Sequence, residues 1–124
     1  MRLTRIDHVQ LAMPEGCEAE ARAFYQGALG IPEVLKPPHL AARGGCWFEA
    51  GPLKVHLGVD ADFRPARKAH PAFRVVDLAG LSARIEAEGY RVVPDGMVDG
   101  CARLYVDDPF GNRIELIEDG IAAA

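Results

Sequence analysis

The amino-acid sequence predicts an α+β fold in which two tandem β-α-β-β-β modules form a cupped mixed sheet with the helices outside. Short segments in which apolar and polar residues alternate are interspersed with two amphipathic helical stretches. The order of these elements in about residues 1–60 recurs in about residues 69–119. The chain has 124 residues, 49% of them hydrophobic, which is the length and apolar content of one core. We therefore expect residues 1–124 to form a single domain of two modules.

The first module is expected to contain one helix, which follows a first strand and precedes three more. Phe24 and Ala28 recur at a helical spacing, and Gly30 is typical of the position just after a helix end. The segment 36–44 contains two prolines and is expected to be a loop over the mouth of the cup. The expected elements are the strand 3–13, the helix 17–29 and the strands 33–35, 45–49 and 53–59.

The second module repeats this order after a polar segment, 60–69, which is typical of a linker. Leu81 and Ile85 lie on one helical stripe, and Gly89 ends that helix as Gly30 ends the first. The last two strands are joined by the turn Asp108-Pro109-Phe110-Gly111-Asn112. The expected elements are the strand 70–76, the helix 78–88 and the strands 90–93, 102–106 and 113–118, with a frayed tail over 120–124.

Charge and composition exclude several classes of partner. The 18 acidic and 14 basic side chains give a net charge of -4 without a basic run, so nucleic acid is not an expected partner. A membrane is not expected either, because no stretch of about 18 apolar residues occurs. The odd number of cysteines, at wide spacings, indicates reduced thiols in a cytoplasmic protein, where Cys17, Cys46 and Cys101 would act as small buried hydrophobes.

Four residues on the polar sides of the predicted strands form a candidate metal site. His8 and His70 lie near the starts of the two modules, and His56 and Glu115 lie near their ends at similar separations. Three imidazoles and one carboxylate suit Zn, Fe, Mn, Ni or Co. His8, His70 and Glu115 alone would also form a two-histidine, one-carboxylate site, with His56 left to move a proton. The alternative is that each is a hydrogen-bonded or solvated strand residue, which is how we interpret His39 in the proline-rich loop.

Several of these residues belong to motifs of a known family. They are Asp7-His8-Val9, Phe24-Tyr25 with Leu29-Gly30-Ile31, and the stretch from Tyr105 to Glu118 that contains Asp108-Pro109-Phe110-Gly111-Asn112-Arg113-Ile114-Glu115-Leu116. Through them the chain resembles, over nearly its whole length, the vicinal oxygen chelate superfamily. This superfamily includes glyoxalase I, extradiol dioxygenases, methylmalonyl-CoA epimerase, fosfomycin-resistance proteins and bleomycin-binding proteins.

The resemblance implies a metal-dependent enzyme, a lyase, isomerase or dioxygenase, that acts on a small molecule with adjacent oxygen atoms. It implies metal ligands at His8, His56, His70 and Glu115, with Glu115 and His56 as the catalytic groups, and it implies a homodimer. Glyoxalase I and the epimerases usually carry Glu or Gln where this chain has His56, which argues against glyoxalase I itself. Candidate substrate contacts are Gln10, Trp47, Phe48, Arg74 and Tyr105.

Two other functions remain open at this point. One is a metal-free protein that sequesters a drug or metabolite, as the bleomycin-binding members do. The other is an accessory domain with a vestigial site. Because all four ligand positions carry side chains able to bind a metal, the sequence favours an enzyme.

Overall fold

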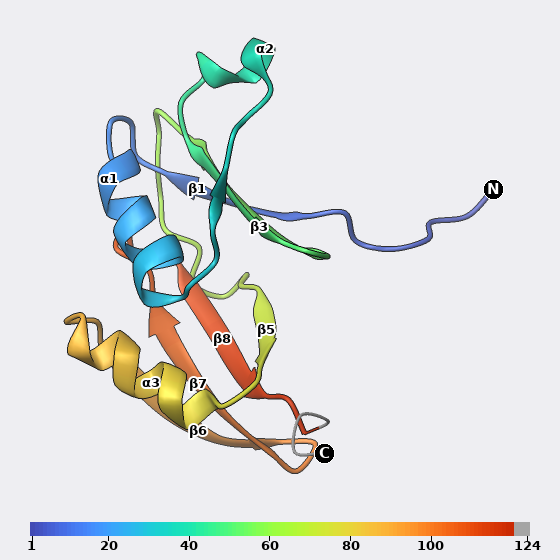
Figure 1. The fold of residues 1–124 in the computed structure, drawn as a ribbon, viewed down its shortest axis with the longest axis vertical. Coiled ribbons are helices and arrows are strands. Elements are labelled where there is room, and N and C mark those ends of the chain that lie inside the picture. The colour runs from blue at the N-terminus through green and yellow to red at the C-terminus, as the bar shows by residue number, and fades with distance from the viewer. Residues whose placement is uncertain (121–124) are drawn as a thin grey trace. The chain divides into compact units, whose positions relative to one another are not determined.

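The computed structural model describes residues 1–120 (Figure 1). It divides the chain into two compact units, from Met1 to Arg64 and from Pro65 onward, which we call module 1 and module 2. Module 1 contains β1 (Val9–Met13), α1 (Glu18–Ala21), the π-helix η1 (Arg22–Ala28), β2 (Glu33–Val34), α2 (Pro38–Ala41), β3 (Cys46–Ala50) and β4 (Leu53–Val59). Module 2 contains β5 (Ala72–Val75), α3 (Leu78–Ala87), β6 (Val92–Val98), β7 (Cys101–Asp107) and β8 (Arg113–Glu118).

The two sheets have the same topology. The strand order is β1-β4-β3-β2 in module 1 and β5-β8-β7-β6 in module 2. In each sheet the first strand pairs in parallel with the last strand of its module, and the remaining pairs are antiparallel. The predicted duplication of a β-α-β-β-β unit in an α+β fold is therefore confirmed.

Several element boundaries differ from those predicted. The first strand begins at Val9, because β4 starts only two residues before the partner of Val9 and offers nothing for residues 3–6 to pair with. The predicted loop 36–44 contains the short helix α2. Strand β6 is longer than expected and contains a register shift between Pro94 and Met97. The predicted frayed tail, apart from Gly120, lies outside the described residues.

Each core lies between the apolar face of a sheet and its helix. In module 1, Phe24 and Tyr25 of η1 are fully buried, and the Tyr25 ring stacks on Phe48 of β3 at 5.4 Å. In module 2, Ile85 of α3 is buried together with Ile114 and Leu116 of β8. Because side chains alternate between the faces of a strand, the residues between these apolar positions lie on the opposite face of each sheet.

The cysteines differ in burial. Cys46 is buried in the core of module 1, where burial raises the pKa of its thiol to about 11. Cys17 and Cys101 are only half-buried, so the prediction that all three are buried is wrong for these two. None of the helices between residues 1 and 120 has the length and apolar character that a membrane span requires.

Gly45 marks a close approach between the start of β3 and β4. Its φ is +83°, and a Cβ built there would overlap the carbonyl oxygen of Leu57. We expect Gly45→Ala to lower the free energy of unfolding by about 2 kcal/mol, measured by urea denaturation. Gly51→Ala is the matched control, because Gly51 also has a positive φ, +58°, but has open space around it. An equal loss in both variants would show that the close approach adds nothing to the backbone strain.

Candidate functional site

The uncovered face of the module 1 sheet presents a row of polar and aromatic side chains. The register places Gln10 of β1 and Trp47 of β3 on either side of His56 of β4. His8 lies two residues before Gln10, just outside the strand. His56 is buried, with 4% of its surface exposed. The strand alternation that predicts this face for His56 therefore agrees with its position in the sheet.

The His56 ring is held from several directions. It stacks on the Trp47 indole at 4.0 Å and on the His8 ring at 4.3 Å. Its Nε2 lies 2.7 Å from Oε2 of Glu49. Because an ionised carboxylate only accepts hydrogen bonds, Nε2 carries the proton and donates it. In the neutral ring the lone pair is then on Nδ1, so the Glu49 contact selects the tautomer of His56.

Glu49 is a site residue that sequence reasoning missed. It lies two residues after Trp47 in β3, so its side chain is on the same face as Trp47. That two-residue spacing from Trp47 was the signal in the sequence that could have identified Glu49 as a site residue. The sequence alone did not reveal that the carboxylate reaches the imidazole of His56, because this contact depends on the pairing of β3 with β4.

A cavity of about 240 Å³ lies in module 1, and its lining includes Gln10 and Trp47, the two register partners of His56. Gly58 contributes to it by having no side chain, since a Cβ there would overlap the Gln10 amide. Lys36, which also lines the cavity, donates a hydrogen bond to the Gly44 carbonyl oxygen. This bond connects the two ends of the segment that contains α2. The cavity is lined by Gln10, Lys36, Leu40, Arg43, Gly44, Trp47, Leu57, Gly58 and Val59. A space of this size suits a small molecule or part of one.

The uncovered face of the module 2 sheet repeats the arrangement with different side chains. Glu115 of β8 pairs in register with Ala72 of β5 and Tyr105 of β7. His70 lies two residues before Ala72, as His8 lies two before Gln10. His70 and Glu115 thus occupy the positions in module 2 that His8 and His56 occupy in module 1.

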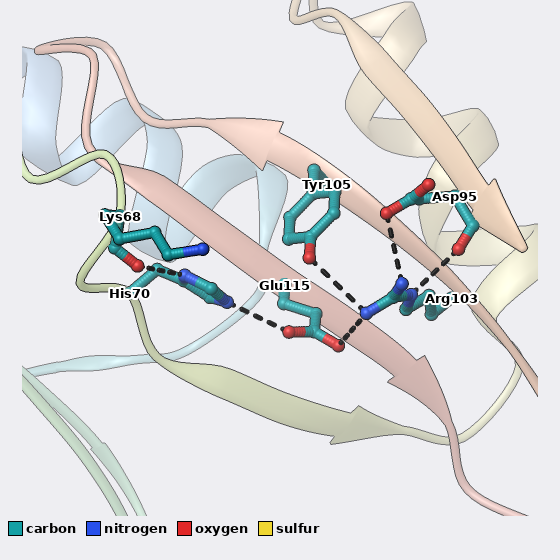
Figure 2. Close-up of polar contacts among 6 residues, drawn as sticks. All are labelled: Lys68, His70, Asp95, Arg103, Tyr105 and Glu115. Atoms are coloured by element: carbon teal, nitrogen blue, oxygen red, sulfur yellow. Dashed lines mark hydrogen bonds and ion pairs between the residues drawn. The ribbon is translucent and has the colours of Figure 1, made fainter. Parts of the chain in front are cut away.

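A polar network surrounds Glu115 (Figure 2). Its Oε1 lies 3.0 Å from Nε2 of His70, and its Oε2 accepts from the Arg103 guanidinium at 3.3 Å. Arg103 is also held by Asp95, whose backbone oxygen accepts from Nε at 2.8 Å and whose carboxylate lies 3.1 Å from a terminal nitrogen. Burial raises the pKa of Glu115, but the hydrogen bonds from His70 and Arg103 outweigh burial and lower the pKa overall. Glu115 is therefore ionised at neutral pH.

The chemistry of the His70 and Glu115 pair fits a bound cation. His70 Nδ1 lies 2.8 Å from the Lys68 carbonyl oxygen, which only accepts, so Nδ1 carries a proton. The ionised Glu115 carboxylate also only accepts. Nε2 of His70 and Oε1 of Glu115 lie 3.0 Å apart, and an imidazole nitrogen and a carboxylate oxygen are both donor types that bind divalent metals. A backbone carbonyl on the other ring nitrogen is also typical of a metal-binding histidine.

The predicted ligands fall into one pair in each module, His8 with His56 and His70 with Glu115. Within residues 1–120, no group of three or more His, Cys, Asp or Glu side chains is placed to hold an ion. The four-residue ligand set remains a prediction. Outside these pairs, His39 lies in α2.

The predicted substrate contacts differ in where they lie. Gln10 and Trp47 line the cavity in module 1. Phe48 is wrong as a substrate contact, because it points into the core, is fully buried and stacks on Tyr25. Arg74 is exposed and donates to the Glu118 carbonyl oxygen at 3.4 Å. Tyr105 lies on the uncovered face beside Glu115.

Comparison with known proteins identifies the family. Residues 5–116 match the model of the Glyoxalase/Bleomycin resistance protein/Dioxygenase superfamily. The chain belongs to this superfamily, which confirms the resemblance inferred from its motifs. A search of curated proteins gives no match.

Solved structures agree with this assignment. A glyoxalase family protein from Bacillus anthracis is 46% identical, with a TM-score of 0.91 over 96% of this chain and 98% of that chain. Two more distant structures show the fold alone. The fosfomycin resistance protein FosX from Listeria monocytogenes is 17% identical, with a TM-score of 0.76 over 97% of each chain. A glyoxalase/dioxygenase from Nostoc punctiforme is 19% identical, with a TM-score of 0.76 over 93% of this chain and 90% of that chain.

Proposed function

We propose that this protein is a metal-dependent enzyme, a lyase, isomerase or dioxygenase, that acts on a small molecule with adjacent oxygen atoms. The observation that carries the proposal is the His70 and Glu115 pair, in which an imidazole nitrogen lies 3.0 Å from an oxygen of a carboxylate whose pKa is lowered. His8, His70 and Glu115 are the proposed ligands, with His56 as a fourth. The ion is Zn, Fe, Mn, Ni or Co, which imidazole and carboxylate donors suit.

When bound, the ion would act as a Lewis acid toward two neighbouring substrate oxygens. Other side chains of each module would supply the other functions. Trp47 and Leu40 give the module 1 cavity apolar walls that limit the access of water, and the Gln10 amide can orient a polar group of the substrate. Arg103 keeps Glu115 ionised, since its hydrogen bond favours the carboxylate.

Of the proposed ligands, His56 could also act in proton transfer. Because Nε2 donates to Glu49, only Nδ1 is left to bind a metal in this tautomer. Without a metal bond, the same Nδ1 lone pair would accept a proton from substrate, with Glu49 stabilising the resulting imidazolium. In both roles Glu49 fixes the ring, so His56 and Glu115 are the proposed catalytic groups.

We expect elemental analysis of untagged protein to find about one transition metal per chain, because the ligand set supplies one site. The same measurement after removal of the metal and reconstitution with each candidate ion identifies the preferred ion. Less than about a tenth of an ion per chain in all these samples would contradict the proposal. Screens of dioxygen uptake and of substrate proton exchange would then separate dioxygenase from lyase or isomerase. Fosfomycin belongs in the compound set because FosX shares the fold.

The second candidate function is a metal-free protein that binds a drug or metabolite. The cavity in module 1 favours it, because Trp47 and Leu40 line a space of about 240 Å³ without requiring an ion. Tight binding of a small molecule by protein that retains no metal would support this function over the enzyme.

We also propose a homodimer in the cytoplasm, on the basis of the family and of the unpaired cysteines. Light scattering in solution measures the oligomeric state.

A further inference from the structure

A second cavity, separate from the one in module 1, lies in module 2. It has a volume of about 150 Å³ and is lined by Tyr105, Asp107, two valines and three arginines, Arg67, Arg91 and Arg113. Arg113 and Asp107 are register partners on the same face as Tyr105. The cavity therefore opens on the uncovered face of the sheet, the face that carries Glu115.

The lining of this cavity has an excess of positive charge. Three guanidinium groups face one carboxylate, although the chain as a whole carries a net charge of -4. The carboxylate of Asp107 is already engaged, since Arg67 donates to it at 2.7 Å and to the Gly111 carbonyl oxygen at 2.7 Å. The Arg113 guanidinium carbon lies 4.9 Å from the centre of the Tyr105 ring. Over residues 1–120, neither Arg91 nor Arg113 forms an ion pair with a carboxylate.

Backbone hydrogen bonds hold two of the arginines, Arg67 and Arg113, in place. The Ala66 nitrogen donates to Oδ1 of the buried Asn112 at 2.9 Å, and the Arg113 nitrogen donates to the Ala66 carbonyl oxygen at 2.9 Å. These bonds attach the residue before Arg67 to the start of β8, so Arg67 and Arg113 are kept near each other. Holding like charges together costs free energy unless an anion offsets their repulsion.

We propose that this cavity binds the anionic group of a small molecule, a phosphate or a carboxylate. Guanidinium groups bind both through paired hydrogen bonds, which a fixed cluster of arginines favours. The cavity has room for such a group and a few attached atoms. Binding of the free anion does not depend on the metal-dependent function proposed above.

The position of the cavity extends this inference to the substrate, and this extension rests on the proposed function. Tyr105 lines the cavity, is the register partner of Glu115, and meets the His70 ring edge-on at 5.6 Å. An anion among the arginines would thus be separated from the His70 and Glu115 pair by the Tyr105 side chain alone. The substrate class is a small molecule with adjacent oxygens at one end and a phosphate or carboxylate at the other.

The test is titration of metal-free protein with inorganic phosphate and, in a separate arm, with succinate, at constant ionic strength. Binding is followed by the NMR signals of the arginine side chains. We expect saturable binding in one arm at least, and the tighter arm identifies the anion. Arg91→Gln and Arg113→Gln should each weaken it about tenfold or more, because each removes a charged hydrogen-bond donor. Arg113→Lys, which keeps the charge but loses the paired geometry, should lie between Arg113→Gln and the unmodified protein.

Arg84→Gln is the control, because Arg84 is exposed on α3, away from the cavity, and the change in net charge is the same. Circular dichroism of each variant verifies that the fold is kept. Absence of saturation in both arms, or equal weakening by Arg84→Gln, would overturn the inference. Since no metal is present in these titrations, their failure leaves the metal proposal standing, and loss of the metal proposal leaves the anion site standing.

Discussion

Glu115→Ala is expected to weaken metal affinity by about a hundredfold or more, because it removes the only carboxylate of the proposed ligand set. The fold should be little affected. Arg103 keeps its bonds to Asp95, and His70 keeps its bond to the Lys68 carbonyl oxygen. The measurement is metal content after dialysis against a chelator of graded strength, with the unfolding midpoint in urea recorded for the same protein.

Asp95→Asn is the matched control for this variant. Asp95 is the other carboxylate that contacts Arg103, but it is not a proposed ligand. A merely electrostatic or structural role for Glu115 would make the two variants similar in metal content. Unchanged affinity in Glu115→Ala would remove Glu115 from the ligand set, and with it the observation on which the proposed enzyme depends.

The parts of the site that sequence predicts are those fixed by local periodicity. Alternation in a strand places each side chain on one face, so the faces of His56 and Glu115 follow from their apolar neighbours. Likewise, the bounds of β4 and β8 agree with the prediction, because a turn precedes each of them. The repeated order of elements then gives the fold.

The parts that sequence did not predict depend on which strands pair and in what register. Glu49 reaches His56, and Arg103 reaches Glu115, across neighbouring strands. A single sequence shows that these residues are polar and on the right face, but it does not give the offset between strands. The predicted start of the first strand was wrong for the same reason. Residues 3–6 alternate like a strand but have no partner along β4.

Asn112→Ala is expected to lower the free energy of unfolding by about 3 kcal/mol, the larger of the two stability effects predicted for this chain. Asn112 is fully buried. Its Oδ1 accepts from the Ala66 nitrogen, and its Nδ2 donates to Oδ2 of Asp108 at 2.9 Å. Alanine would leave a backbone donor and a buried carboxylate oxygen without these partners, and it would also leave a small void.

The consequence would extend beyond the turn itself. Ala66 precedes Arg67 and lies two residues before Lys68, whose carbonyl oxygen fixes the tautomer of His70. Loosening this segment should therefore weaken anion and metal binding together, whereas Arg113→Gln should affect only anion binding. Urea denaturation measures the stability, with Glu86→Ala on the exposed side of α3 as control, where a change within about 0.5 kcal/mol is expected. If Asn112→Ala also stayed within that range, the Asn112 side chain would not be what attaches the linker segment to β8.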